Sequence, residues 1–222
     1  SASREPRVPI VLDTSDPLLK EFWPLALAPG KQLDATRRIV EHLEADLSIV
    51  DGFRSAALLA SGDGTSLVLV AAWRDDGAAD RAHAALAGWL DAETDTALAR
   101  RRFGTLTPRV FLRRTVGTPP ILDESAMLLF TRYALKPGHS FGALAALSDS
   151  NLAMRVLQDT AAQGGAMLVA ADSGAIYVVM RARTATALDA SQATNGGGLP
   201  FWAPFAQREE QLLAVVAVVQ HR

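Results

Sequence analysis

The sequence predicts an α+β protein built from two ferredoxin-like repeats, and three observations lead to this prediction. Residues 57–74 and 166–183 align without a gap, and each reads as an apolar strand, a tight turn and a second apolar strand. A matching Pro-Gly turn precedes each hairpin, in "LALAPGK" (25–31) and "YALKPGH" (133–139). A final apolar strand follows each hairpin, at 109–117 and 212–220. Each half is therefore expected to run strand–helix–strand–strand–helix–strand.

The elements of the first half follow from local patterns. After Pro29-Gly30, apolar residues recur at helical spacing and predict one buried face, made of Leu33, Val40, Leu43, Leu47 and Val50. The turn Ser61–Thr65 contains two glycines, which accept the backbone angles that a hairpin needs. A second helix is expected to begin near Asp75 and to lead to the strand 109–117.

The second half has the same order with weaker signals. Leu144 and Leu147 fit one helical phase, and Leu152 and Val156 fit another, so a kink or a new N-cap is expected at 148–151. The hairpin 166–183 follows, and "NGGGLPFWAPF" (195–205) leads to the last strand. Thr118-Pro119-Pro120 separates the halves, since two prolines cannot continue a helix or a central strand. The predicted domains are residues 1–117 and 121–222.

Composition excludes several classes of protein. The chain has 222 residues, 49% of them hydrophobic, and a formal net charge of −2. Arg100–Arg102, interpreted as the end of a helix, is too short a basic run to indicate nucleic-acid binding. There is no cysteine, and the four histidines show no metal-ligand spacing, so no metal is predicted. No apolar run approaches the ~20 residues of a membrane span, and the first residues resemble no signal peptide, so a cytoplasmic location is expected.

"GHSFG" at 138–142 matches the G-x-S-x-G pattern of serine hydrolases. The same place in the first half is "PGKQL", which has no serine, so the turn belongs to the repeat. A triad of Ser140, Asp189 and His221 is the least favoured alternative.

Residues 51–83, "DGFRSAALLASGDGTSLVLVAAWRDDGAADRAH", resemble the central part of the antibiotic biosynthesis monooxygenase family, in the dimeric α+β barrel superfamily. The shared features are a Gly-Phe at the start of a strand, a glycine-rich hairpin, a strand ending in Trp, and a helix with a His ten residues further on. The resemblance implies two four-stranded antiparallel sheets that close a barrel, with helices outside. Here two fused halves would form that barrel within one chain. The stretch "SLVLVAAW" is consistent with such a barrel, because a strand that is apolar on both faces must be covered on both faces.

The resemblance also implies a pocket in the first half. Trp73 would line it as an aromatic wall, and His83 would act as general base or as hydrogen-bond donor to a phenolate. Leu69 stands where some relatives carry an Asn that contacts the substrate. Phe53 and Trp89 are further candidates for the pocket wall. Core packing is the alternative interpretation for each aromatic residue, and a surface position is the alternative for His83.

The second half offers two more candidate binding residues. Arg181 is expected to face the barrel interior, so it needs a carboxylate partner, an exposed strand end or an anionic ligand. Trp202 lies in 196–205, where glycines followed by aromatic residues suit a lid over a substrate. The alternative is an irregular loop that covers the core.

The function implied by the resemblance is an oxygenase that acts on an aromatic polyketide-like substrate of the quinol, anthrone or naphthol type. Molecular oxygen would be the co-substrate, with no bound metal or organic cofactor. Reduced flavin from a partner reductase is left open, as is the choice between monomer and homodimer. The alternatives are a polyketide cyclase or isomerase that uses the same pocket, and a non-catalytic small-molecule binding protein.

Overall fold

The computed structural model describes residues 9–95, 100–101, 108–124, 126–158, 162–182 and 200–222. The elements in chain order are β1 (Ile10–Val11), β2 (Leu19–Ala26), α1 (Gln32–His42), the π-helical turn η1 (Leu43–Leu47), β3 (Phe53–Ser61), β4 (Ser66–Trp73), α2 (Asp76–Asp95), β5 (Arg100–Arg101), β6 (Arg109–Gly117), β7 (Ile121–Leu122), β8 (Met127–Leu135), α3 (Phe141–Gln158), β9 (Ala162–Ala170), β10 (Ala175–Ala182) and β11 (Ala206–Gln220). Within this part of the chain, none of the helices has both the length and the apolar character needed to cross a bilayer.

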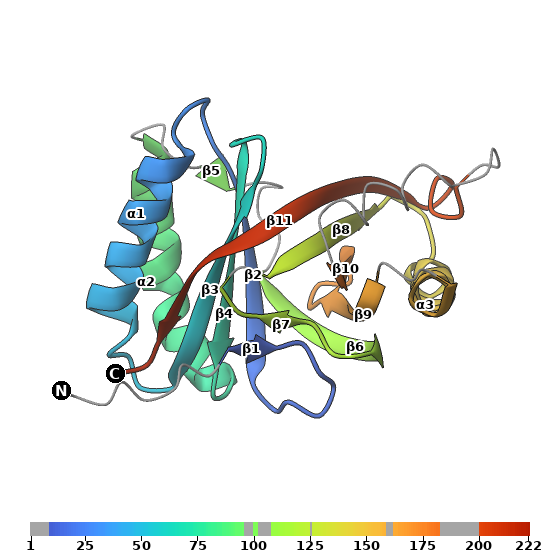
Figure 1. Ribbon diagram of the computed structural model, residues 1–222, viewed down its shortest axis with the longest axis horizontal. Helices are drawn as coiled ribbons and strands as arrows, with labels where there is room; N and C mark the ends of the chain where they lie inside the picture. The colour runs from blue at the N-terminus through green and yellow to red at the C-terminus, as the bar shows by residue number, and fades with distance from the viewer. Residues whose placement is uncertain (1–8, 96–99, 102–107, 125, 159–161, 183–199) are drawn as a thin grey trace.

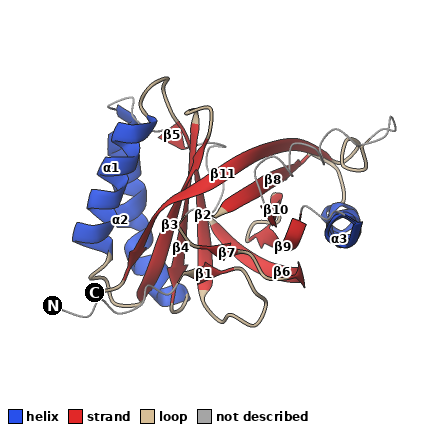
Figure 2. Cartoon of the chain, viewed as in Figure 1, coloured by secondary structure: helices blue, strands red, loops and turns tan. Residues whose placement is uncertain are grey.

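Eight antiparallel strands close into a barrel, in the order β4-β3-β11-β8-β10-β9-β6-β2, with β2 pairing back to β4. The helices lie outside this barrel, with α1 and α2 together on one side and α3 on the other (Figures 1 and 2). The prediction of an α+β fold with a barrel is therefore confirmed.

The barrel closes through two joins between strands that are far apart in the sequence. β11, the last strand, pairs with β3, and β6 pairs with β9. The strands before Pro119 run β6-β2-β4-β3, and those after it run β11-β8-β10-β9. Each run of four therefore has two edges that are paired only because the other run is present.

The two predicted hairpins are present, and aligned aspartates order their turns. Asp63 Oδ1 accepts hydrogen bonds from the Thr65 amide and from Ser61 Oγ, at 3.0 and 2.7 Å. Asp172 Oδ1 accepts from the Gly174 amide at 2.8 Å. Such carboxylate-to-backbone bonds stabilise tight turns, which explains why the repeat has Asp at both positions.

Apolar side chains fill both faces of the sheet. Along β4, Val68 and Val70 join the core inside the barrel, whereas Leu67, Leu69 and Trp73 join a second core beneath α1 and α2. A third core lies beneath α3. Inside the barrel, the rings of Phe22, Phe130 and Tyr177 lie 5.4–5.7 Å from one another. The barrel interior is thus a packed core, as its two-sided apolar strands require.

Four local predictions were wrong. Leu33 is 83% exposed, because the buried row of the first helix consists of Ala35, Ile39, Leu43 and Leu47 at i, i+4 spacing. α3 has no new helix start at 148–151, and Asp149 within it forms an ion pair with Arg114 of β6. Arg100–Arg101 forms β5, which pairs with β2, and is not a helix end. The last strand also begins at Ala206, earlier than expected.

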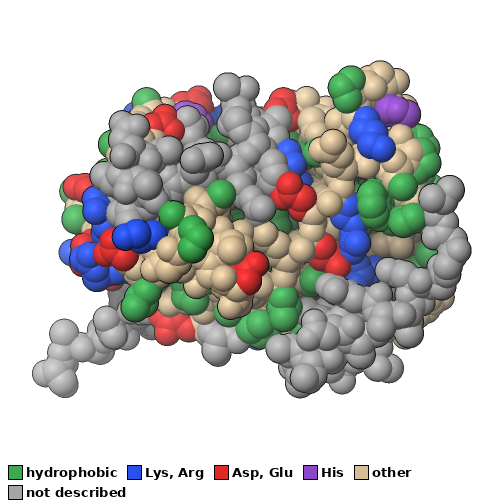
Figure 3. All heavy atoms as spheres, turned by 90° about the horizontal axis from the view of Figure 1, so that it is seen from above, with side chains coloured by type: hydrophobic (Ala, Val, Ile, Leu, Met, Phe, Trp, Pro, Cys, Tyr) green, Lys and Arg blue, Asp and Glu red, His purple; other side chains and the backbone are tan. Residues whose placement is uncertain are grey.

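Charged side chains of both signs occur together on the face shown in Figure 3, and neither sign covers it.

Candidate active site

The site forms around a buried carboxylate on β2. Successive side chains of a strand alternate between faces, so Glu21, Trp23 and Leu25 all face the helices α1 and α2. Glu21 is 0% exposed. A carboxylate in an apolar layer is costly unless hydrogen bonds or charges compensate it. Its surroundings therefore determine its chemistry.

Two indoles hold one oxygen of Glu21. Nε1 of Trp73 donates to Oε2 at 3.1 Å, and Nε1 of Trp23 donates to the same oxygen at 3.4 Å. Trp73 is itself 0% exposed and packs edge-on against Phe53, with ring centroids 5.4 Å apart. The carboxylate is thus held at a fixed position by rigid donors.

His83 of α2 faces the other oxygen. Its Nδ1 lies 3.6 Å from Glu21 Oε1, an ion-pair distance that is slightly too long for a hydrogen bond. The His83 side chain is 40% exposed, and its ring centroid lies 5.1 Å from that of Trp23. Within the described chain, Oε1 has no hydrogen-bond donor. The site therefore consists of a buried carboxylate behind an imidazole that solvent can reach.

Burial raises the pKa of Glu21 above its usual value, while the charge of His83 and the two indole hydrogen bonds oppose this rise. The order of groups, with a buried carboxylate facing Nδ1 of a histidine, is the one found in a serine-protease triad, where the carboxylate orients the imidazole. The arrangement is suited to general-base chemistry.

Arg109 fixes the helix that carries His83. It lies opposite Glu21 in the β2–β6 register, and its guanidinium contacts Asp76 at 3.1 Å and Asp80 at 2.6 Å, both on α2. These ion pairs tie the first turns of α2 to the sheet. The position of His83 relative to Glu21 thus depends on the ion pairs that Arg109 forms with α2.

The structure brings five of the predicted site residues to the layer beneath α1 and α2: Leu69, Phe53, Trp73, Trp89 and His83. Trp73 is fully buried and donates a hydrogen bond to Glu21. Its predicted stacking contact with a substrate is not tested by this arrangement and stays a prediction. Trp89 packs against the same layer and stacks on His42 at 4.1 Å.

The other two predicted residues lie elsewhere. Arg181 has a carboxylate partner, one of the three alternatives given for it, since its Nη2 lies 3.4 Å from Asp123 Oδ1. Trp202 packs in the α3 layer, 5.8 Å from the Arg208 guanidinium. Residues 196–199 of the predicted lid lie outside the described residues. Arg181 and Trp202 therefore do not join the Glu21–His83 site.

Ser140 has a structural position. Its Oγ accepts a hydrogen bond from the Ala143 amide at 3.3 Å, as a residue that caps a helix start does. The C-terminus, next to His221, lies on the opposite side of the molecule from α3 (Figure 1). Asp189 lies outside the described residues. The serine and histidine of the alternative triad are not brought together.

Sequence reasoning missed Glu21. A signal was present, because Leu19, Glu21, Trp23 and Leu25 form one face of a strand on which only Glu21 is charged.

No protein-family model matches the sequence, and a comparison with curated proteins finds no relative. Solved structures do match. A protein described as anthrone oxidase-like aligns with a TM-score of 0.69 and 13% identity, over 95% of this chain and 96% of its own. A putative monooxygenase from Fusobacterium nucleatum aligns with a TM-score of 0.57 and 8% identity, over 93% of this chain and 95% of its own. A putative monooxygenase from Lactobacillus acidophilus aligns with a TM-score of 0.50 and 11% identity, over 92% of this chain and 97% of its own. These likenesses show the α+β-barrel fold.

Proposed function

We propose that the protein is an oxygenase that oxidises an aromatic, polyketide-like substrate of the quinol, anthrone or naphthol type. The observation that carries this proposal is the buried Glu21 carboxylate, 3.6 Å behind the half-exposed imidazole of His83. The fold likeness to an anthrone oxidase-like protein and to putative monooxygenases supports it. A serine hydrolase is disfavoured, because Ser140 caps a helix.

His83 acts as general base in this proposal. It takes an acidic proton from the substrate, either a phenolic O–H or a C–H next to an aryl ketone, and leaves an electron-rich carbanion or phenolate. Glu21 holds the negative charge that stabilises the imidazolium. The indole of Trp23, beside His83, provides an apolar aromatic surface for a planar ring.

Dioxygen is the oxidant. For an anthrone, the methylene carbon loses two hydrogens and gains one oxygen atom as a carbonyl, and the second oxygen atom leaves as water. Electrons and atoms balance between substrate and dioxygen alone, so this reaction requires neither a bound metal nor reduced flavin from a reductase.

We further propose that the barrel is a tandem fusion of two ferredoxin-like repeats, with the active site in the first repeat. The repeated strand order supports this. The anthrone oxidase-like structure supports it as well, because a single chain of that structure spans both halves. Aligned on their Pro-Gly turns, the second half has Leu129 in place of Glu21 and Thr131 in place of Trp23. The hairpin alignment puts Ala182 in place of Trp73. The second half therefore lacks the groups that make the carboxylate–imidazole pair.

Oxygen uptake tests this function. The wild-type protein is given a panel of anthrones, naphthols and quinols, with and without oxygen. We expect uptake above the buffer rate, with about 10²–10⁴-fold lower kcat in His83→Gln. His139→Gln, which changes an exposed histidine two residues before α3, is the matched control and should keep full activity.

Other outcomes would contradict the proposal. Conversion of substrate in the absence of oxygen would indicate a cyclase or isomerase. Binding without conversion would indicate a non-catalytic small-molecule binding protein. Uptake that appears only with reduced flavin would contradict the proposed stoichiometry.

A further inference from the structure

A cavity of about 550 Å³ opens at the end of the barrel where β2 and β3 begin and β11 ends. This volume is within the usual range for small-molecule sites, roughly 300–1,000 Å³. The segment before β2, residues 9–18, forms one part of its lining, and the adjoining ends of β3 and β11 form another. The candidate active site is separate, because Glu21 faces the helices and none of its partners lines this cavity.

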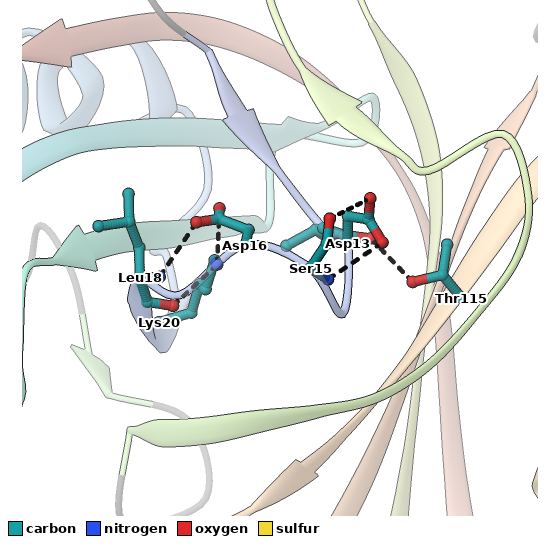
Figure 4. Close-up of polar contacts among 7 residues, drawn as sticks. Asp13, Ser15, Asp16, Leu18, Lys20 and Thr115 are labelled. Atoms are coloured by element: carbon teal, nitrogen blue, oxygen red, sulfur yellow. Dashed lines mark hydrogen bonds and ion pairs between the residues drawn. The ribbon is translucent and has the colours of Figure 1, made fainter.

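The loop before β2 supplies acceptors (Figure 4). Ser15 donates to both carboxylate oxygens of Asp13, from its amide at 3.4 Å and from its hydroxyl at 2.8 Å. Asp16 accepts from Nζ of Lys20 at 2.8 Å, and Lys20 is only 3% exposed. The Asp16 charge is therefore already balanced. The Ser15 hydrogen bonds hold Asp13 in place and lower its pKa, so Asp13 stays an ionised, solvent-accessible acceptor.

The strand ends supply donors. The His221 amide donates to the Arg54 carbonyl at 3.0 Å, which holds these two residues side by side. Both are exposed, and both line the cavity. The Arg54 guanidinium makes no ion pair within the described chain. A guanidinium recognises a carboxylate by paired hydrogen bonds, so Arg54 is suited to bind an anion.

Apolar side chains complete the lining of the cavity. Val11 and Leu18 contribute them from the same segment as Asp13. The cavity therefore offers an anion-binding donor from one chain segment, a hydrogen-bond acceptor from another, and an apolar surface. A ligand that satisfies all three is a ring with a carboxylate at one end and a hydroxyl group at the other.

We propose that this cavity binds a small hydroxylated aromatic carboxylate. Its carboxylate pairs with Arg54, its hydroxyl donates to Asp13, and its ring lies on Val11 and Leu18.

Binding of para-hydroxybenzoate tests the proposal. Calorimetric titration of the full chain should show saturable binding at up to millimolar ligand, and amide NMR shifts should move at Ser55 and His221. We expect Arg54→Gln to weaken binding at least about tenfold. Arg113→Gln removes the same charge from an exposed arginine of β6 outside the cavity and should leave the affinity unchanged. Absence of saturation, equal affinity in Arg54→Gln, or shifts confined to other regions would overturn the proposal.

Three further ligands test how the groups are used. Benzoate lacks the hydroxyl and phenol lacks the carboxylate, so both should bind more weakly than para-hydroxybenzoate. Asp13→Asn should reduce the advantage of para-hydroxybenzoate over benzoate. Tighter binding of phenylalanine would contradict the proposed ligand class. Oxygen uptake in Arg54→Gln should equal that of the wild-type protein, so failure here leaves the Glu21–His83 proposal standing.

Discussion

Glu21 shows how one residue couples burial to protonation. Its carboxylate lies in an apolar layer where ionisation is unfavourable, and two indoles and one imidazole compensate part of that cost. The folded protein thus holds the Glu21 proton more tightly than the unfolded chain does. The free energy of unfolding must fall as the pH rises from 4.5, the unperturbed value, through the raised pKa of the folded state.

Glu21→Gln, which cannot titrate, tests this coupling. Between pH 4.5 and the folded pKa, the wild-type protein should lose stability relative to the variant, by up to about 1.4 kcal/mol per pH unit. Urea unfolding of both proteins across this range measures the difference. The loss should be larger in a His83→Gln background, which removes the compensating charge. Glu44→Gln, at an exposed position, is the control and should show no such trend. A flat difference for Glu21→Gln would contradict the raised pKa.

Sequence reasoning named His83 and Trp73 as candidate site residues but did not name Glu21, and the reason is physical. His83 and Trp73 belong to a recognisable stretch, whereas Glu21 lies in a strand whose helix-covered face depends on tertiary packing. The same limit applies to Leu33. Leu33 was expected to be buried because it is a large apolar residue at helical spacing from others. The helix instead packs through the smaller Ala35 and through Ile39.

At the scale of elements, the join between β6 and β9 depends on close backbone approach. A Cβ added at Gly164 would lie 1.9 Å from the Thr118 carbonyl oxygen and 2.6 Å from its nitrogen. These backbone atoms directly follow β6, and the Thr118 amide donates to the Gln163 carbonyl at 3.2 Å. Only glycine allows this approach without displacement of the strand.

Gly164→Ala should therefore destabilise the protein by at least about 2 kcal/mol, by forcing β9 away from β6. Gly62→Ala, in the β3–β4 turn with nothing within 4 Å of the added atom, should change stability by less than about 1 kcal/mol. Thermal and denaturant unfolding measure both. Equal stability of the two variants would show that the join tolerates a wider spacing.

The strands themselves could be predicted because their signals are local. Gly and Asp mark both hairpin turns, and the aligned residues Asp63 and Asp172 perform the same task in each. The ion pair that Asp149 of α3 forms could not be predicted, because its partner Arg114 lies on a strand distant in the sequence.

At the scale of the whole molecule, closure makes the two halves interdependent. Without the second half, β3 and β6 would be unpaired edges, and without the first, β9 and β11 would be. Unpaired edges of this length favour association with another strand. Fusion supplies the missing partner within one chain.

Residues 1–117 and 121–222, produced separately, should therefore fail to form stable monomers and should assemble together in a 1:1 complex. Light scattering and circular dichroism of each fragment and of the mixture measure this. Two stable, non-interacting monomers would contradict the interdependence and would make the halves autonomous domains.

The most direct test of the central claim, that Glu21 and His83 take a proton from the substrate, leaves oxygen out. Under anaerobic conditions in deuterated buffer, the methylene protons of an anthrone are followed by NMR with wild-type protein, Glu21→Gln, His83→Gln and the control His139→Gln. We predict exchange well above the buffer rate with the wild-type protein and the control, and slow exchange with both site variants. Wild-type exchange rates in His83→Gln would contradict the account.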